Sequence, residues 1–149
     1  MKTVREMLHK KGNKIHSISP NQKIFEALQL MAAKDVGALL VLDGESLIGI
    51  ISERDYARKV ALEGKSSKDC LVSDIMTPNV MYVEIESSTD ECMTLMINKK
   101  VRHLPVFDNG KLVGVISIGD VVNAVIDEEK FINEQLVRYI TDKPPIKGN

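Results

Sequence analysis

One long internal repeat constrains the fold of this chain more than any other feature. Residues 15–55 align with residues 80–120 at a constant offset of 65 without a gap, and 13 of the 41 aligned positions carry the same residue. A repeat of this length is a supersecondary unit that cannot bury its apolar side alone and has to pack against another copy. The sequence therefore predicts two related halves, each with a related surface.

Each copy predicts the element order strand, helix, strand, strand, helix. Apolar residues recur at helical spacing in the first helix, and a Gly-containing turn separates the two later strands, which is typical of a hairpin. In the first copy we expect these elements at 14–18, 23–34, 38–42, 46–51 and 52–62. In the second copy we expect them at 80–83, 88–100, 103–107, 111–116 and 117–127. The result is an α/β fold of tandem β-α-β-β-α repeats with pseudo-twofold symmetry, in which two small sheets pack together with helices outside.

The repeat also sets the expected domain boundaries. The first repeat with its lead-in is expected at residues 1–66, the second at 67–128, and a C-terminal helix with a tail at 129–149. Within the last segment, Phe131–Ile140 is amphipathic, and prolines in 141–145 are expected to end any helix. A helix outside the repeat could cover the module or dock on a second subunit.

Composition and charge narrow the class of protein. A chain of 149 residues that is 44% hydrophobic is long enough for one core and too short for two large domains. A net charge of −1 argues against a nucleic-acid-binding surface, and the apolar runs are too short for a membrane span. We expect no secretory leader, and the two cysteines form no C-x-x-C pair. We therefore expect a cytoplasmic protein that binds neither nucleic acid nor membrane.

The sequence offers little catalytic chemistry. The three histidines lie far apart without the spacing of metal ligands, so no metal site is expected. Neither Cys70 nor Cys92 has an evident base partner for thiol catalysis. No catalytic motif is present, and we predict that the chain is not an enzyme.

The strand–helix junction of each copy carries the most informative motif. Residues 49–55 read GIISERD and residues 114–120 read GVISIGD, so an apolar strand runs into a helix that begins at Ser and has Asp three residues later. One interpretation is structural, because Ser-x-x-Asp is close to a capping box. The other is functional. The glycine lets a group approach the backbone, the helix N-terminus can bind an anion, and a carboxylate can bind a ribose diol.

The duplicated unit with G-h-h-[ST]-x-x-D at this junction resembles a CBS domain pair, or Bateman module, over about residues 3–127. The resemblance implies a free-standing regulatory module that binds adenosyl ligands (AMP, ADP, ATP, NAD or S-adenosylmethionine) in clefts between the copies, and no catalytic cofactor. It implies that Asp55 and Asp120 hold the ribose hydroxyls, with Ser52 and Ser117 as hydroxyl partners. It places four apolar residues near the adenine: Ile15, Ile50, Val80 and Val115.

The two copies differ in their basic residues. Arg102 and His103 match a position that carries phosphate-contacting basic residues in the adenylate-sensing γ subunits of AMP-activated kinase. The first copy has no cation there but has Arg54 inside its motif. These residues predict anionic ligands at both sites. The alternative is that Arg54 is a solvated helix residue and His103 a hydrogen-bonded strand histidine.

The sequence thus predicts a regulatory adenine-nucleotide-binding module, expected to be a homodimer, that signals to an unidentified regulated protein. The ligand would act by favouring one conformation over another. The alternative is a structural dimerisation or interaction module whose nucleotide clefts do not function. The sequence names neither the preferred nucleotide nor the regulated protein.

Overall fold

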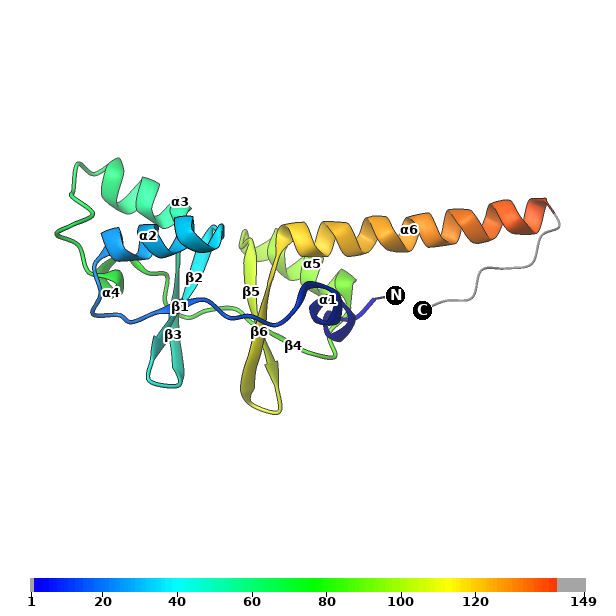
Figure 1. Cartoon of the computed structure of the whole chain (residues 1–149), viewed down its shortest axis with the longest axis horizontal. Coiled ribbons are helices and arrows are strands. Elements are labelled where there is room, and N and C mark those ends of the chain that lie inside the picture. Colours follow the sequence, from blue (N-terminus) through cyan, green and yellow to red (C-terminus); the bar gives the residue numbers. More distant parts are fainter. Residues whose placement is uncertain (1, 142–149) are drawn as a thin grey trace. The chain divides into compact units, whose positions relative to one another are not determined.

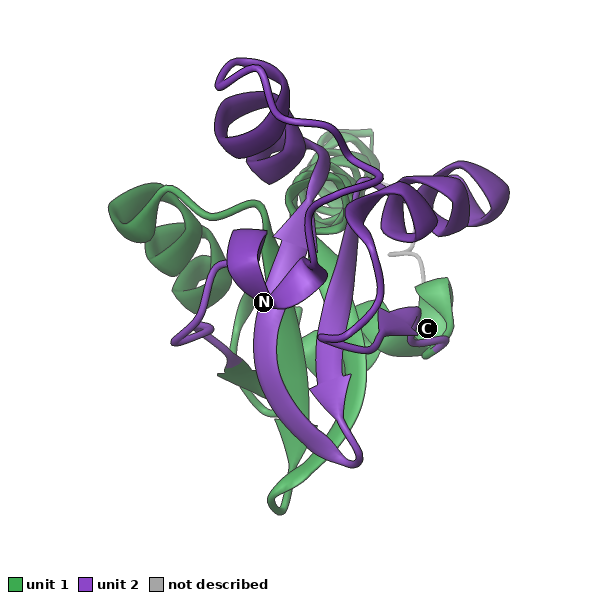
Figure 2. Ribbon diagram, turned by 90° about the vertical axis from the view of Figure 1, so that its left-hand side faces the viewer, with its two compact units in different colours: residues 1–13, 83–149 green, residues 14–82 purple. Residues whose placement is uncertain are grey.

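A computed structural model describes residues 2–141 of the chain (Figure 1). The chain divides into two compact units (Figure 2): unit 1 consists of Met1–Asn13 and Val83–Asn149, and unit 2 of Lys14–Tyr82. These units combine segments from both sequence repeats, and the repeat boundaries at 66 and 128 stay a prediction. The tail expected beyond residue 141 lies outside the described residues.

Unit 2 contains one three-stranded sheet with order β1-β2-β3. Strand β1 is parallel to β2, and β2 is antiparallel to β3. Its elements are β1 (Ser17–Ile18), α2 (Ile24–Lys34), β2 (Ala38–Asp43), β3 (Ser46–Ser52), α3 (Glu53–Tyr56), a π-helix (Ala57–Ala61) and α4 (Val72–Ile75).

Unit 1 has the same sheet topology, with order β4-β5-β6. Its elements are α1 (Val4–Lys11), β4 (Val83–Glu84), α5 (Thr89–Lys99), β5 (His103–Asp108), β6 (Lys111–Ser117) and α6 (Ile118–Ile140). The register is also the same, because Ala38 pairs with Ser52 in unit 2 and His103 pairs with Ser117 in unit 1. The predicted α/β fold with two small sheets is confirmed.

Turn chemistry explains both hairpins. The loop between β5 and β6 is Asn109-Gly110, and both residues have positive φ, at 50° and 79°. Two positive φ values in a two-residue loop are what a type I′ turn requires, and Asn-Gly is its preferred sequence. In the other hairpin Gly44 supplies a φ of 62°.

The core of each unit is formed by the sheet and the helices packed on it. In unit 2, Leu39 and Val41 of β2 and Ile51 of β3 are buried together with Ile24 of α2. In unit 1 the equivalent positions of β5 and β6 are buried, together with Val4 of α1. The apolar side chains of the strands that face this core account for the hairpin register that the two units share.

A short helix, here called the lead-in helix, precedes each repeat copy. Backbone hydrogen bonds dock it on the other copy. Helix α1 precedes the first copy but packs in unit 1, and α4 precedes the second copy but packs in unit 2. The same three bonds occur in both units. In unit 1 they run from Val4 N to Ser87 O, Arg5 N to Ile85 O and Thr89 N to Lys2 O, at 2.8–2.9 Å. In unit 2 they run from Val72 N to Gln22 O, Ser73 N to Pro20 O and Ile24 N to Cys70 O, at 2.8–3.0 Å.

A glycine in the last strand of each sheet allows this close approach. A Cβ atom at Gly114 would lie 2.9 Å from Cδ2 of Leu8 in α1. A Cβ atom at Gly49 would lie 2.5 Å from Sδ of Met76 and 3.1 Å from the backbone oxygen of Thr77. The glycines that open the two sequence motifs therefore admit the lead-in segments to the sheet.

Three sequence predictions need correction. The first strands are shorter than expected, so Ile15 and Val80 lie before β1 and β4 rather than on them. The helix expected over 52–62 is a short α3 followed by a π-helical turn. The helices expected at 117–127 and 131–140 are one continuous helix, α6, because the residues between them, Glu-Glu-Lys, permit a helix to continue.

We expect the substitution G114A to lower the free energy of unfolding by about 1–3 kcal/mol, because Leu8 has to move away from the added methyl group. G119A is the matched control. Its Cβ would meet only the Ser117 side chain, at 3.6 Å, so it should be neutral or stabilising by up to about 1 kcal/mol. Urea denaturation measures both, and equal stability of the two variants would contradict this account.

Candidate functional site

The Ser-x-x-Asp motif forms a capping box in both units. Ser52 Oγ accepts a hydrogen bond from Asp55 N at 3.2 Å, and the Asp55 carboxylate accepts one from Ser52 N at 3.0 Å. In unit 1 the corresponding distances between Ser117 and Asp120 are 3.2 and 2.7 Å. The structural interpretation of the motif is therefore correct. The capping box uses only part of each carboxylate, and the groups at its remaining acceptor positions differ between the two units.

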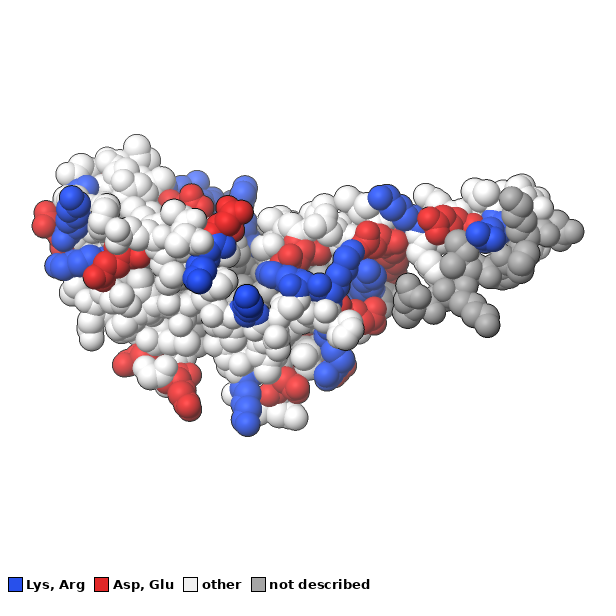
Figure 3. All heavy atoms as spheres, in the orientation of Figure 1, with Lys and Arg blue, Asp and Glu red and all other residues white. Residues whose placement is uncertain are grey.

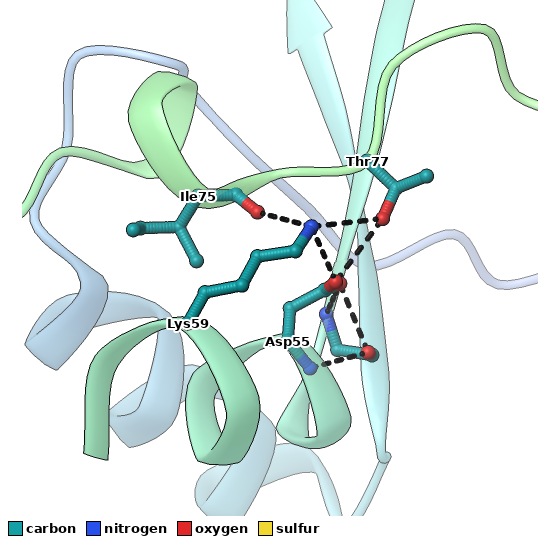
Figure 4. A network of polar contacts seen from close by, with 5 residues as sticks. Asp55, Lys59, Ile75 and Thr77 are labelled. Atoms are coloured by element: carbon teal, nitrogen blue, oxygen red, sulfur yellow. Dashed lines mark hydrogen bonds and ion pairs between the residues drawn. The ribbon is translucent and has the colours of Figure 1, made fainter. Parts of the chain in front are cut away.

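In unit 2 the Asp55 carboxylate is fully engaged by its own chain (Figure 4). Its Oδ2 atom accepts from the backbone N and from Oγ of Ser52, both at 3.0 Å. Its Oδ1 atom accepts from Thr77 Oγ1 at 3.1 Å and forms an ion pair with Lys59 Nζ at 3.0 Å. A carboxylate has about four lone-pair positions, so a ligand has to displace one of these groups to reach Asp55.

Lys59 is equally engaged. Besides Asp55, its ammonium group donates to the backbone oxygen of Ile75 at 3.1 Å and to Thr77 Oγ1 at 3.5 Å (Figure 4). An ammonium group has three donors, so all three have acceptors here. The network ties the first turn after β3 to the end of the lead-in segment.

In unit 1 the Asp120 carboxylate is more open. Its Oδ2 atom accepts from Ser117 N and from Lys11 Nζ at 2.6 Å, and no described residue donates a hydrogen bond to Oδ1. The Asp120 side chain is 21% exposed, compared with 12% for Asp55. Burial acts to raise the pKa of Asp120, but hydrogen bonds from Lys11 and Ser117 outweigh burial and lower it. Asp120 is therefore ionised at neutral pH and has acceptor capacity left.

Lys11 in unit 1 and Thr77 in unit 2 donate hydrogen bonds to equivalent acceptors. Thr77 donates its backbone N–H to the oxygen of Ile50 at 2.8 Å and its hydroxyl to Asp55. Lys11 donates from its ammonium group to the oxygen of Val115 at 2.8 Å and to Asp120. A neutral residue in one unit is thus replaced by a cation in the other.

The basic pair at the start of β5 lies near this lysine. Arg102 is exposed, and its backbone oxygen accepts from the first amide of α6, that of Ile118, at 2.8 Å. The pKa of His103 is lowered by burial and by the charges of Lys11 and Arg102, against the opposing effect of Asp120. His103 is therefore neutral at pH 7, and the cations of this site are Lys11 and Arg102.

The other predicted residues are less closely gathered. In unit 2, Asp55 contacts Ser52 and Thr77, and Thr77 pairs with Ile50. In unit 1, Asp120 contacts Ser117 and Lys11, and Lys11 also donates to Val115. Ile15 and Val80 are half-buried. Arg54 is exposed, and no ion pair or hydrogen bond joins its side chain to another described residue, so the cation on Asp55 is Lys59 instead.

Sequence reasoning missed Lys11, Lys59 and Thr77. Lys59 follows Asp55 by four residues, which is a spacing that brings charges together on a helix. Thr77 and Lys11 lie in the lead-in segments. Their roles depend on which copy each lead-in packs against, and local sequence carries no signal for that choice.

Metal binding, membrane insertion and thiol chemistry have little support in the described residues. Within residues 2–141 no group of three His, Cys, Asp or Glu residues could hold a metal ion, and no helix is long and apolar enough to cross a membrane. Burial raises the pKa of the Cys92 thiol to about 11, so it stays protonated. Acidic and basic side chains are mixed on the face shown in Figure 3.

A cavity of about 290 Å³ lies in unit 2 between the end of α2 and the start of α3. Apolar side chains of α2, including Leu28 and Met31, form part of its wall, and Asp35 and Glu53 line it as well. None of the predicted ligand-binding residues lines this cavity.

Comparison with known proteins identifies the family. The model of the CBS domain matches residues 4–62 and 72–127, which together are most of the chain. The chain therefore belongs to the CBS-domain family and contains a pair of these domains, as the resemblance predicted.

Similar proteins include one relative of known sequence and two solved structures. The mitochondrial CBS domain-containing protein CBSX3 of Arabidopsis thaliana is 34% identical over 147 residues, which cover 93% of this chain and 71% of CBSX3. A putative signal-transduction protein with CBS domains from Burkholderia ambifaria is 51% identical with a TM-score of 0.82, over 85% of this chain and 95% of that chain. CBSX2 in complex with AMP is 28% identical with a TM-score of 0.68, over 87% of this chain and 99% of that chain.

We expect His103 to make unit 1 less stable in weak acid. The unfolded chain binds a proton near pH 6.5, whereas the folded chain resists protonation because its pKa is lowered. Stability is therefore highest above pH 6.5 and falls as the pH drops through 6.5 toward the lower folded pKa, by less than about 1.4 kcal/mol per pH unit.

Urea denaturation between pH 5 and 8 tests this sign. The substitution H103Q should remove part of the pH dependence, while H9Q, at an exposed position of α1, should retain it. A pH dependence that is the same in the wild type and H103Q would contradict the assignment to His103.

Proposed function

We propose that the chain is a regulatory module that binds an adenosyl ligand at Asp120. One observation carries this proposal: the Asp120 carboxylate is ionised and accessible, and no described residue donates to its Oδ1 atom. A carboxylate in this state can accept hydrogen bonds from the hydroxyls of a ribose. Ser117 holds it in place from the helix N-terminus.

The charge around Asp120 favours a ligand that carries phosphate. Lys11 pairs with the Asp120 carboxylate and the charge of Arg102 acts on the nearby His103, while Asp55 is paired with the single cation Lys59. Lys11 uses two of its three donors within the chain, at Asp120 and Val115, and the third is available for a phosphate oxygen. Lys11 thus supplies a phosphate contact that complements Arg102.

The comparison with CBSX2 in complex with AMP supports the ligand class. We propose AMP as the first candidate, with ADP, ATP, NAD and S-adenosylmethionine as members of the same class. Thermal-shift measurements against these five ligands would rank them, because a ligand that binds the native state raises its apparent stability.

Asp55 would be the weaker of two sites. Ser52, Ile50, Arg54, Ile15 and Val80 belong to it on the same reasoning, as Val115 and His103 belong to the site at Asp120. A ligand there has to break contacts of Asp55 with Thr77 or Lys59. Binding at Asp55 therefore costs more than binding at Asp120.

The ligand would act on a partner by favouring one state of the module. A ligand at Asp120 shares the carboxylate with Lys11, which lies at the end of α1, so occupancy is coupled to the position of that helix. The effect on a partner equals the difference in ligand affinity between the two states. We propose a cytoplasmic regulatory role and no catalytic reaction.

We expect D120A to weaken AMP binding roughly ten- to hundredfold, because losing a hydrogen bond to a charged group costs about 1.5–3 kcal/mol. D55A should weaken AMP binding less but lower the melting temperature more, since it removes four contacts within the chain. Calorimetric titration and thermal unfolding measure these effects. Unchanged AMP affinity in the double variant would refute both sites.

We expect K11M to reduce the preference for AMP over adenosine about tenfold, because the methionine cannot contact a phosphate. K10M is the matched control, since Lys10 is on the same helix and pairs with Asp127 at 2.5 Å. Titration with AMP and adenosine measures the ratio. An equal loss of both ligands in K11M would contradict a role in phosphate selection.

A further inference from the structure

The helical segment after β3 contains one residue more than the start of α6. Through the Ser-x-x-Asp motif the two copies align at an offset of 65, and this offset also pairs the first core-facing residues, Tyr56 in unit 2 and Val121 in unit 1. The next buried residues are Val60 and Ala124, for which the offset, 124 minus 60, is 64. Unit 2 therefore has an extra residue between these two core positions.

A π-helical turn accommodates the extra residue. Two of its hydrogen bonds span five residues instead of four, from Leu62 N to Ala57 O at 3.0 Å and from Lys65 N to Val60 O at 2.9 Å. The corresponding part of α6 is a regular α-helix. Such π-helical turns are rare and frequently occur at functional sites. The polar side chain that this turn repositions is Lys59.

The wide turn keeps Lys59 out of the core. At an offset of 65 Lys59 would align with Ala124, which is buried, and an ammonium group buried there would need a counterion. Instead Val60 takes the buried position. The Lys59 side chain stays 44% exposed, with its Nζ atom 3.0 Å from Asp55 Oδ1 (Figure 4). The extra residue thus combines a filled core with a cation at the motif aspartate.

Lys59 cannot assist a ligand while it holds Asp55. Its three donors have acceptors on Asp55, Ile75 and Thr77, so no donor is left for a phosphate oxygen. Lys11 of unit 1 differs, because it retains one donor. A ribose hydroxyl that approaches Asp55 meets a carboxylate whose acceptor positions are filled, and Lys59 is the charged group among those that fill them.

We propose that Lys59 determines the ligand affinity of the Asp55 site. It is a built-in competitor, because its ammonium group holds the Oδ1 atom that a ribose would otherwise use, and the extra residue in the π-helical turn leaves it there. This role rests on the proposed function, since it takes the ligand to be an adenosyl compound bound through the motif aspartates. It makes Asp120 the site that fills first, although both motifs have the same Ser and Asp.

Titration of the Asp55 site alone tests the competition. The variant D120A retains only this site. We expect D120A/K59M to bind both AMP and adenosine about tenfold more tightly than D120A, because methionine leaves Oδ1 open to the ribose. D120A/R58M is the matched control. It removes a cation from the same turn at an exposed position, so its affinity should equal that of D120A. Circular dichroism confirms that each variant is folded.

The outcomes separate this role from the proposed function. If the wild type binds AMP but K59M brings no gain in the D120A background, Lys59 is not a competitor and the proposed function stands. A loss of AMP binding without a loss of adenosine binding would make Lys59 a phosphate ligand and overturn the proposal. An equal gain with R58M would reduce the effect to net charge and overturn it as well. If neither the wild type nor K59M binds AMP or adenosine, the role and the proposed function both fall.

Two single-residue deletions test the extra residue without a ligand. Deletion of Arg58 would place Val60 three residues after Tyr56, which is the spacing in α6, so we expect little change in melting temperature. Deletion of Asn123 is the matched control. It moves Ala124 out of its buried position in a regular helix and should lower the melting temperature by about 5 °C or more. Equal losses would show that unit 2 has no extra residue and would overturn this account of how Lys59 is placed.

Discussion

The fold depends on the backbone hydrogen bonds that dock each lead-in segment onto the other repeat copy. Three bonds with the same pattern occur in both units, and a strand glycine makes room for the lead-in in each. A repeat copy without its lead-in would leave these backbone groups unpaired, which is costly for buried groups. Because the lead-ins are exchanged, each compact unit contains segments that belong to both repeats.

The same docking creates the difference between the two candidate sites. Each lead-in ends beside the Ser-x-x-Asp motif of the copy it docks on, and its last residues complete the surroundings of the aspartate. In unit 2 this residue is Thr77, a short neutral side chain whose backbone pairs with Ile50. In unit 1 it is Lys11, which reaches the same groups through its ammonium. The charge paired with each motif aspartate is thus set by residues that lie outside the motif.

Much of the fold could be predicted because its signals are local. Helical spacing located α2, the Asn109-Gly110 pair located a hairpin, and the repeat predicted the equivalent elements of the second copy. The helical lead-ins and their exchange could not be predicted, because they depend on packing between distant segments. The continuity of α6 was missed for a different reason. The repeat suggested a boundary after residue 127, but a helix continues wherever no residue stops it.

For the site, the motif identified both aspartates correctly as helix-capping residues. The motif contains neither of the two lysines that pair with them. Lys11 arrives from the exchanged lead-in, for which the local sequence has no signal, whereas the spacing of four residues between Asp55 and Lys59 could have indicated their pairing.

The unbroken course of α6 has a mechanical consequence. Asp120 lies in its first turn and Ile140 at its last residue, so the carboxylate and the far end belong to one rigid body. A helix of 23 residues is about 34 Å long, and a tilt of about 10° at its base would move its tip by about 6 Å. α6 can therefore act as a lever arm. A displacement of atomic size at its capped end becomes a movement large enough to reset contacts far from the capped end.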